Sequence, residues 1–439
     1  MMKPGTDDSG TTQGTATHED GSTYAWARLA VALVVMTISG AGLYVVVVVL
    51  PTVQAEFNVA RADASLPYTL TTIGFGIGGL FMGRLADRFG VMVPVLIGGV
   101  TVGLGFIAAG MAGSIWTFAL LHGVLIGMFG SSAMFAPLIA DTSLWFTRRR
   151  GIAVAICASG SYTAGAIWPP VAQHFVATYG WRATYIGIGV FCALTLPALA
   201  LLFRRRPPAV DAFPSAGRVT ERASTNSLAP AASAGRPFGM TPGAAQALLC
   251  IAALSCCIAM AMPQVHIVAY CGDLGYGVAR GAQMLAVMLG FGVVSRLLSG
   301  VICDRIGGLR TLLLGSALQV VALLLFLPFD GLVSLFVISA LFGLFQGGIV
   351  PSYAIIIREH FPPTEAGARV GMVLMFSLFG MALGGWLSGK VFDLTGSYQA
   401  AFVNGIGWNL LNLAIAVTLL YRAGSRRART PDTAAGVAS

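Results

Sequence analysis

The stretch Gly83-Arg-Leu-Ala-Asp87-Arg88-Phe-Gly90 closes one apolar run of the chain, and Gly300-Val-Ile-Cys-Asp304-Arg305-Ile-Gly307 closes another. Both follow the pattern G-x-x-x-D-R-x-G, and they lie 217 residues apart in a chain of 439 residues. A pattern repeated at half the chain length indicates two related copies of one larger unit. Repeated halves built from membrane-length apolar segments are typical of transporters with a central axis.

The composition points to a membrane protein. The chain is 56% hydrophobic and only 10% charged, with a mean hydropathy of +0.81, whereas a soluble protein is about a quarter charged. Apolar stretches of about 20 residues, enough to cross about 30 Å of hydrocarbon, recur twelve times. They lie near residues 26–50, 64–86, 93–112, 115–140, 150–173, 183–203, 242–270, 280–303, 310–328, 332–357, 367–392 and 400–421. We therefore expect an all-α membrane protein with twelve transmembrane helices in two pseudo-symmetric six-helix halves.

The spans divide the chain into five parts. Residues 26–203 form the expected N-terminal half and residues 242–421 the C-terminal half. Between them, 204–241 is a low-complexity segment of Arg, Ala, Ser and Pro, which predicts a linker with little fixed structure. Residues 1–25 and 422–439 are expected to be tails. The first residues lack a basic region, so the first helix itself is expected to act as the insertion signal.

The basic residues predict the orientation. The chain carries 24 arginines and 2 lysines, with a net charge of +9. If the N-terminus is cytoplasmic, 21 of these 26 residues fall on the cytoplasmic side and four outside. This asymmetry places both termini in the cytoplasm of a cell inner (plasma) membrane protein. Because the charges lie in short loops between spans, they indicate a lipid bilayer as partner and not nucleic acid.

The sequence holds no pattern typical of an enzyme or a cofactor site. The seven cysteines lie in or beside apolar segments, without C-x-x-C spacing and without histidine partners, so we expect no metal and no disulfide. The phosphate-binding pattern G-x-x-x-x-G-K-[ST] is absent, which excludes ATP-driven transport by this chain alone. No acid/base pair stands within the spans, so catalysis is not expected.

Two six-helix halves, a linker and the repeated loop motif resemble the major facilitator superfamily, and the resemblance covers residues 26–421. In that family the loop charges latch the cytoplasmic side when the cavity opens outward. The resemblance implies this gating role for Asp87 and Arg88, and likewise for Asp304 and Arg305. The alternative is a charged loop that only sets the topology. The first copy departs from the family by continuing with Val91-Met92 where basic residues are usual.

Several short motifs are similar to monocarboxylate porters and to their oxalate/formate-antiporter relatives. The stretch from Trp145 to Gly160 places an aromatic pair and three arginines before a Gly/Ala-rich helix, as at the start of the fifth helix in that group. The other matching motifs are Leu50-Pro51 to Ser65 with Arg61, Val265-His266 with Asp273-Leu274-Gly275, and Phe392-Asp393 with Gly396-Ser-Tyr398. The resemblance implies alternating-access transport of small organic anions, such as lactate or pyruvate, by a monomeric functional unit.

Arg296 is the most informative single residue of the spans, because it is a charged residue inside one of them. It stands in an apolar run, where a guanidinium costs several kcal/mol unless it meets water, an anion or a partner. Its planar fork suits a carboxylate, and in the resembled group an arginine at this place binds the substrate carboxylate. The alternative is an arginine satisfied by helix carbonyls or reaching toward the membrane surface.

The resemblance does not extend to the proton-coupling charges. Proton-coupled members carry an aspartate one turn before that arginine and a lysine in the first helix. Here the turn before Arg296 offers Gly292, and the first span has no lysine. Anion exchange or another proton carrier therefore stays open.

Other polar residues complete the candidate site. His266 and His122 are candidate proton carriers because histidine titrates near neutral pH, although a lone membrane histidine is more often a packing residue. His266 also joins Tyr44, Tyr162 and Gln346 as a candidate substrate-binding residue. Asp141 is expected to form an ion pair at the membrane surface with the arginines at 148–150.

Two other functions remain in competition. An exporter of drugs or other metabolites would use an apolar aromatic cavity, with Arg296 as a structural residue. A membrane sensor would bind a ligand without moving it and would signal through 204–241 or the tails, which are too short and featureless for a signalling domain. A substrate panel separates the carboxylate transporter from the exporter.

Overall fold

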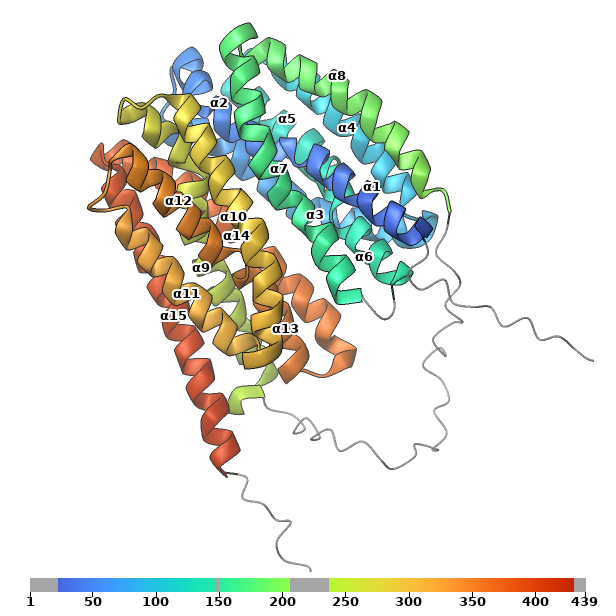
Figure 1. The fold of residues 1–439 in the computed structure, drawn as a ribbon, viewed down its shortest axis with the longest axis vertical. Helices are drawn as coiled ribbons and strands as arrows, with labels where there is room; N and C mark the ends of the chain where they lie inside the picture. The colour runs from blue at the N-terminus through green and yellow to red at the C-terminus, as the bar shows by residue number, and fades with distance from the viewer. Residues whose placement is uncertain (1–22, 147–149, 206–236, 430–439) are drawn as a thin grey trace, which may run out of the picture.

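The computed structural model describes residues 23–146, 150–205 and 237–429, and every regular element in these ranges is a helix. Most of the expected linker and tails therefore lies outside the described residues. The first half comprises α1 (Thr23–Ser39), α2 (Ala41–Phe57), α3 (Arg61–Phe89), α4 (Met92–Gly110), α5 (Ile115–Leu121), the π-helix η1 (His122–Met128), the 3₁₀-helix η2 (Ser131–Met134), α6 (Ala136–Trp145), α7 (Arg150–Tyr179), α8 (Trp181–Ala200) and η3 (Leu201–Phe203). The second comprises η4 (Pro237–Gly239), α9 (Pro242–Asp273), α10 (Val278–Ile306), α11 (Gly308–Leu325), α12 (Leu332–Gln346), α13 (Ile349–His360), α14 (Pro363–Thr395) and α15 (Tyr398–Arg429). Figure 1 shows the two halves side by side, blue to green and yellow to red.

Consecutive helices combine into the expected spans. Eleven units of the described chain are long and apolar enough to cross a membrane, and four of them join two or more segments: α1 with α2, α5 through α6, α8 with η3, and α12 with α13. The twelfth span is α3, which is 29 residues long but carries Thr69, Thr71 and Thr72 on its buried side. These threonines lower its hydropathy. The predicted fold of twelve spans in two halves is confirmed, and the last helix continues to Arg429, past the predicted end at 421.

The repeated sequence motif has the same backbone shape in both halves. Gly90 ends α3 with φ 84° and ψ 164°, and Gly307 ends α10 with φ 82° and ψ 164°. Each glycine donates its N–H over 2.8 Å, to the carbonyl of Ala86 and of Cys303 respectively. A side chain is strained at positive φ, which explains a glycine at the end of each copy.

Helices meet closely through glycine, because a residue without a side chain lets two helix backbones approach each other. A Cβ added to Gly74 of α3 would collide with the carbonyl of Gly123, and one added to Gly343 of α12 would collide with the carbonyl of Met288. The fourth span of each half is also broken, by η1 and η2 in the first half and between α12 and α13 in the second. The halves therefore repeat a tight contact as well as a discontinuous helix.

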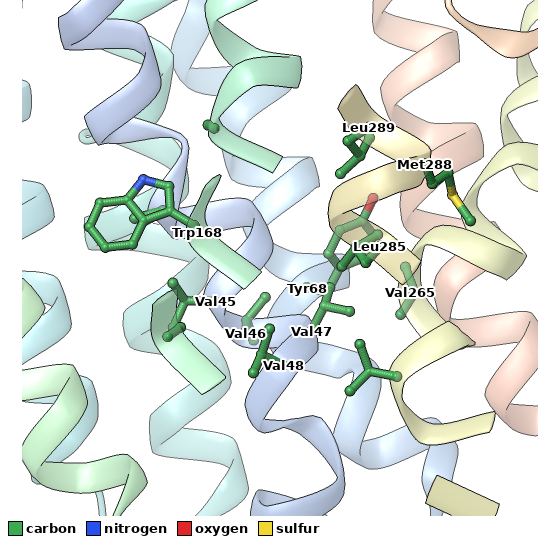
Figure 2. Packing of buried hydrophobic residues seen from close by; sticks show 14 of the residues in the cluster. Val45, Val46, Val47, Val48, Tyr68, Trp168, Val265, Leu285, Met288 and Leu289 are labelled. Carbon is green, nitrogen blue, oxygen red and sulfur yellow. The ribbon is translucent and has the colours of Figure 1, made fainter. Parts of the chain in front are cut away.

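The halves meet along α7 with α10 and along α3 with α14. Figure 2 shows part of this boundary, where Tyr68 of α3 lies among side chains of α9 and α10 such as Val265 and Leu285. At Gly165 of α7, a Cβ would collide with Leu289 of α10. We call the end where α8 ends and α9 begins the linker end, and the opposite end the far end.

Candidate functional site

Arg296 of α10 points across the boundary into the first half. Its Nη1 donates to the carbonyl of Ala158 in α7 over 2.9 Å, and its guanidinium carbon lies 4.8 Å from the centre of the Tyr162 ring. Its Nε is buried and has no hydrogen-bond partner. The side chain therefore faces the other half and not lipid, and part of its donor capacity is free.

The ring of Tyr162 fills the space beside Gly292. A Cβ on Gly292 would lie 2.5 Å from Cδ1 of this ring. Any side chain at 292 would require the ring to move. The position where the resembled proton-coupled members carry an aspartate is thus occupied here by a tyrosine of the other half, which also stacks against Arg296 through a cation–π contact.

Tyr44 of α2 completes this group. It lies near both Tyr162 and Arg296, and its Cζ lies 2.9 Å from the position that a Cβ on Gly165 would take. Tyr44 and Tyr162 are both partly exposed. Among the described residues neither hydroxyl has a hydrogen-bond partner, so the two phenols and the guanidinium together offer free donors to a ligand. We call Arg296, Tyr44 and Tyr162 the central site.

Gln346 lies behind the central site, inside the second half. It is fully buried at the end of α12 and accepts a hydrogen bond from Nε2 of Gln264 over 3.0 Å, while its own Nε2 has no partner. The next residue, Gly347, packs against Ser295, which precedes Arg296. Gly347, at the break between α12 and α13, therefore packs directly against the segment of α10 that carries Arg296.

The two histidines are packed away from the central site. His266 of α9 is fully buried, and its Nε2 donates to the carbonyl of Gly385 in α14 over 2.8 Å. His122 is fully buried within the first half, between the hydroxyls of Thr71 at 3.3 Å and Tyr185 at 3.2 Å. Each histidine thus joins helices of its own half.

The predicted gating residues stand apart at the linker end. Asp87, Arg88, Asp304 and Arg305 are all exposed, and none of them forms an ion pair with another described residue. The amide of Gly308 instead donates to Glu359 of the same half over 3.2 Å. The latch role stays a prediction.

A cluster that the sequence did not single out joins the halves at the far end. Arg61 of α3 reaches Asp273 of α9, with 3.1 Å between Nη1 and Oδ2, and it donates to the hydroxyl of Tyr398. The carboxylate of Asp393 accepts the amides of Arg61 and Ala62 over 2.8 and 2.9 Å, so it caps the positive end of α3. We call Arg61, Asp273, Asp393 and Tyr398 the clasp.

The clasp brings together three of the motifs that carry the resemblance to monocarboxylate porters. Those motifs contain Arg61, Asp273 and the pair Asp393 and Tyr398, but their pairing depends on how the halves dock. Beside the clasp, a hollow of about 350 Å³ is lined by Pro51, Gln54, Ala55, Asn58, Val59, Arg61 and Asp273. This hollow opens above the Arg61–Asp273 ion pair.

Asp141 is buried and not at the membrane surface as predicted, and it pairs with an arginine that the sequence did not single out, whereas the arginines at 148–149 lie outside the described residues. Its carboxylate pairs with Arg28 of α1, at 2.8 Å from Nε and 2.9 Å from Nη2, and the two side chains are only 7% and 4% exposed. Trp145 and Phe203 lie over the guanidinium. Since α1 and α6 are 113 residues apart at these positions, only the fold reveals the pair.

Comparison with known proteins identifies a family model and several relatives that this chain matches. A family model described as "Major Facilitator Superfamily" matches residues 32–342 and 298–438. Monocarboxylate transporter 13 of Rattus norvegicus is 27% identical over 376 residues, covering 83% of this chain and 81% of that protein. Monocarboxylate transporter 11 of Homo sapiens is 27% identical over 340 residues, covering 73% and 66%. The MFS-type transporter opdF of Penicillium oxalicum is 26% identical over 306 residues, covering 68% and 66%.

Solved structures share the fold at low sequence identity. A bacterial homolog of the human lysosomal transporter Spinster, inward-facing and occupied, has a TM-score of 0.68 at 15% identity, covering 93% of this chain and 99% of that one. A variant of the nucleoside transporter NupG has a TM-score of 0.69 at 12% identity, covering 91% and 99%. These likenesses concern the arrangement of helices.

Proposed function

The chain belongs to the Major Facilitator Superfamily and is a multi-pass membrane secondary transporter, not an enzyme, and from this premise we propose that its substrates are small organic monocarboxylates such as lactate and pyruvate. The observation that carries the proposal is the guanidinium of Arg296 at the boundary of the halves, which has no acidic partner among the described residues and whose Nε makes no hydrogen bond. A carboxylate there would gain a charge-assisted hydrogen bond. The similarity to two monocarboxylate transporters supports the same substrate class.

The three residues of the central site would bind the substrate together. Arg296 anchors the carboxylate through its free donors, and the hydroxyls of Tyr44 and Tyr162 donate to the carboxylate or to a neighbouring substrate oxygen. Gln346 holds the broken fourth span of the second half in place behind Arg296. His266 supports the far end through α14.

The charges at the two ends support an inward-facing state. We assign the linker end to the cytoplasm of the inner membrane, since most basic residues lie there. The clasp then closes the outer side, while Asp87, Arg88, Asp304 and Arg305 form no ion pair with another described residue on the cytoplasmic side. Alternating access would separate the clasp and bring these gating residues into contact.

Counterflow in proteoliposomes tests the substrate class. Vesicles that contain the purified full chain and unlabelled pyruvate are placed in labelled pyruvate or lactate, and tracer accumulation is measured. Arg296→Ala should lower it about 10- to 100-fold, the equivalent of one or two lost hydrogen bonds to a charged group. Arg280→Ala is the matched control, because Arg280 is an exposed arginine near the start of the same helix.

The exporter alternative gives the opposite result. Normal counterflow by Arg296→Ala at normal expression would rule out the anchoring role. Efflux of a lipophilic cation, with no movement of either carboxylate, would identify an exporter with an aromatic cavity.

A further inference from the structure

Arg296 differs from every other arginine that the fold withdraws from solvent. Among the arginines whose side chains the structure describes, five are not exposed. Four of them contact a carboxylate: Arg28 with Asp141, Arg61 with Asp273, Arg182 with Glu56, and Arg369 with Glu365. Only Arg296 in this group has no acidic partner, and like Arg61 of the clasp it lies at the boundary that must open and close.

The groups around Arg296 cannot supply a negative charge at neutral pH. The titratable side chains that face it are Tyr44 of α2 and Tyr162 of α7, and behind them lie Tyr68 of α3 with Cys256 and Cys257 of α9. Phenols and thiols are neutral near pH 7. Elsewhere along the boundary, the described acids that contact the opposite half are Asp273 and Asp393 of the clasp, at the far end.

The packing also prevents a carboxylate from being close by. The ring of Tyr162 fills the space at Gly292, one turn before Arg296. His122 and His266 are fully buried in contacts within their own halves. The charge of Arg296 can therefore be balanced by a bound anion, but by no described protein group.

We infer that this carrier is an anion exchanger, which changes its facing only when a carboxylate neutralises Arg296. Arg296 is partly exposed in this structure. Closing the halves around its guanidinium without a bound anion would remove the charge from water without a counter-charge, which is unfavourable in a low dielectric. A bound carboxylate replaces that water and leaves a neutral pair. The inference rests on the proposed carboxylate site and extends it from the substrate class to the mode of transport.

Efflux from proteoliposomes tests this mode with the wild-type full chain. The vesicles contain labelled pyruvate, and potassium with valinomycin holds the membrane potential constant. Efflux into buffer with unlabelled pyruvate should exceed efflux into carboxylate-free buffer by about tenfold or more, since each tenfold in rate corresponds to about 1.4 kcal/mol in the barrier. An imposed proton gradient should leave the slow net efflux unchanged.

The outcomes separate this inference from the proposed function. Net efflux as fast as exchange, or net efflux accelerated by the proton gradient, overturns the exchange mechanism and leaves the carboxylate substrate intact. If neither mode moves pyruvate or lactate, the proposed function fails and the exchange mechanism fails with it.

A designed counter-charge gives a second test. Tyr162→Ala makes room at position 292, and combining it with Gly292→Asp places a carboxylate one turn from Arg296. The empty carrier can then reorient, so the ratio of net efflux to exchange should rise at least about tenfold above that of the control pair Tyr162→Ala with Gly292→Asn. The asparagine control has the same shape without the charge. Equal ratios in the two double variants contradict the inference, and the wild-type measurement decides if neither double variant is produced.

Discussion

Charged residues join the two halves at the far end of the boundary, whereas at the linker end the described charged residues make contacts within one half. At the far end the clasp joins the halves, because Arg61 of the first half meets Asp273, Asp393 and Tyr398 of the second. At the linker end, the ion pairs and capping contacts of the described chain stay within one half. Examples are Arg28 with Asp141 in the first half and Glu359 with the amide of Gly308 in the second.

This difference shows how the molecule can move. At the linker end these contacts join helices within one half, and we call them braces. Each half can therefore keep its shape while the two halves separate there. The far end is held by one inter-half cluster of charged and aromatic residues, which includes the contact of the Arg61 guanidinium carbon at 4.7 Å from the Phe392 ring centre. Breaking a brace should therefore unfold a half, whereas breaking the clasp should change which side is open.

The largest effect is expected from Asp141→Asn, which breaks the brace of the first half. Arg28 would keep its charge in a site where its side chain is only 4% exposed, and leaving a buried ion unpaired costs about 3–5 kcal/mol. Thermal unfolding of the purified protein in detergent measures the loss. The matched control replaces both Arg28 and Asp141 with leucine, which should recover much of the stability. An unchanged melting temperature for Asp141→Asn would show that the pair does not brace α1 against α6.

The next effect is expected from Arg61→Gln, which weakens the clasp without leaving a fully buried charge, because Asp273 is 42% exposed. Loss of its charge-assisted bonds, about 1.5–3 kcal/mol, should shift the population toward the outward-open state about 10- to 100-fold. Ser65 is fully buried one turn along α3, so Ser65→Cys should react with an impermeant maleimide faster in the Arg61→Gln background. Arg280→Gln is the control for charge alone. Equal labelling rates in both backgrounds would contradict the closing role of the clasp.

The sequence could predict the fold but not these pairings. The repeated motif, with Gly90 and Gly307 in one backbone conformation, is local, and so is the length of each span. By contrast, Arg61 lies 212 residues from Asp273 and its amide bonds Asp393 at a separation of 332 residues. Such partners depend on how two independently packed halves dock, which no local pattern records. The direction of Arg296 was likewise hidden, because its mostly apolar neighbours along the helix do not mark the side that faces the other half.

Asp87→Ala tests the linker end, where a smaller effect is expected. Asp87 is exposed and unpaired among the described residues in this state, so its loss should leave the melting temperature unchanged. Uptake should nevertheless fall about tenfold if Asp87 forms one charge-assisted contact when the linker end closes. Asp330→Ala serves as the control, because Asp330 is another exposed aspartate between helices. Normal uptake at normal expression would remove the latch role and leave Asp87 as a topology signal.

The smallest effect is expected from His266→Gln, which tests whether the side chain of His266 takes up a proton during transport. The Nε2 of His266 donates to the carbonyl of Gly385, and its Nδ1 has no partner in a fully buried site. A glutamine amide can donate to the same carbonyl, so uptake should stay within about twofold and keep its dependence on external pH. His266→Leu, which cannot make this bond, should loosen α9 from α14 and lower uptake further. If His266→Gln instead flattens the pH profile, His266 takes up a proton during transport, and the contact between α9 and α14 must open for that proton to enter.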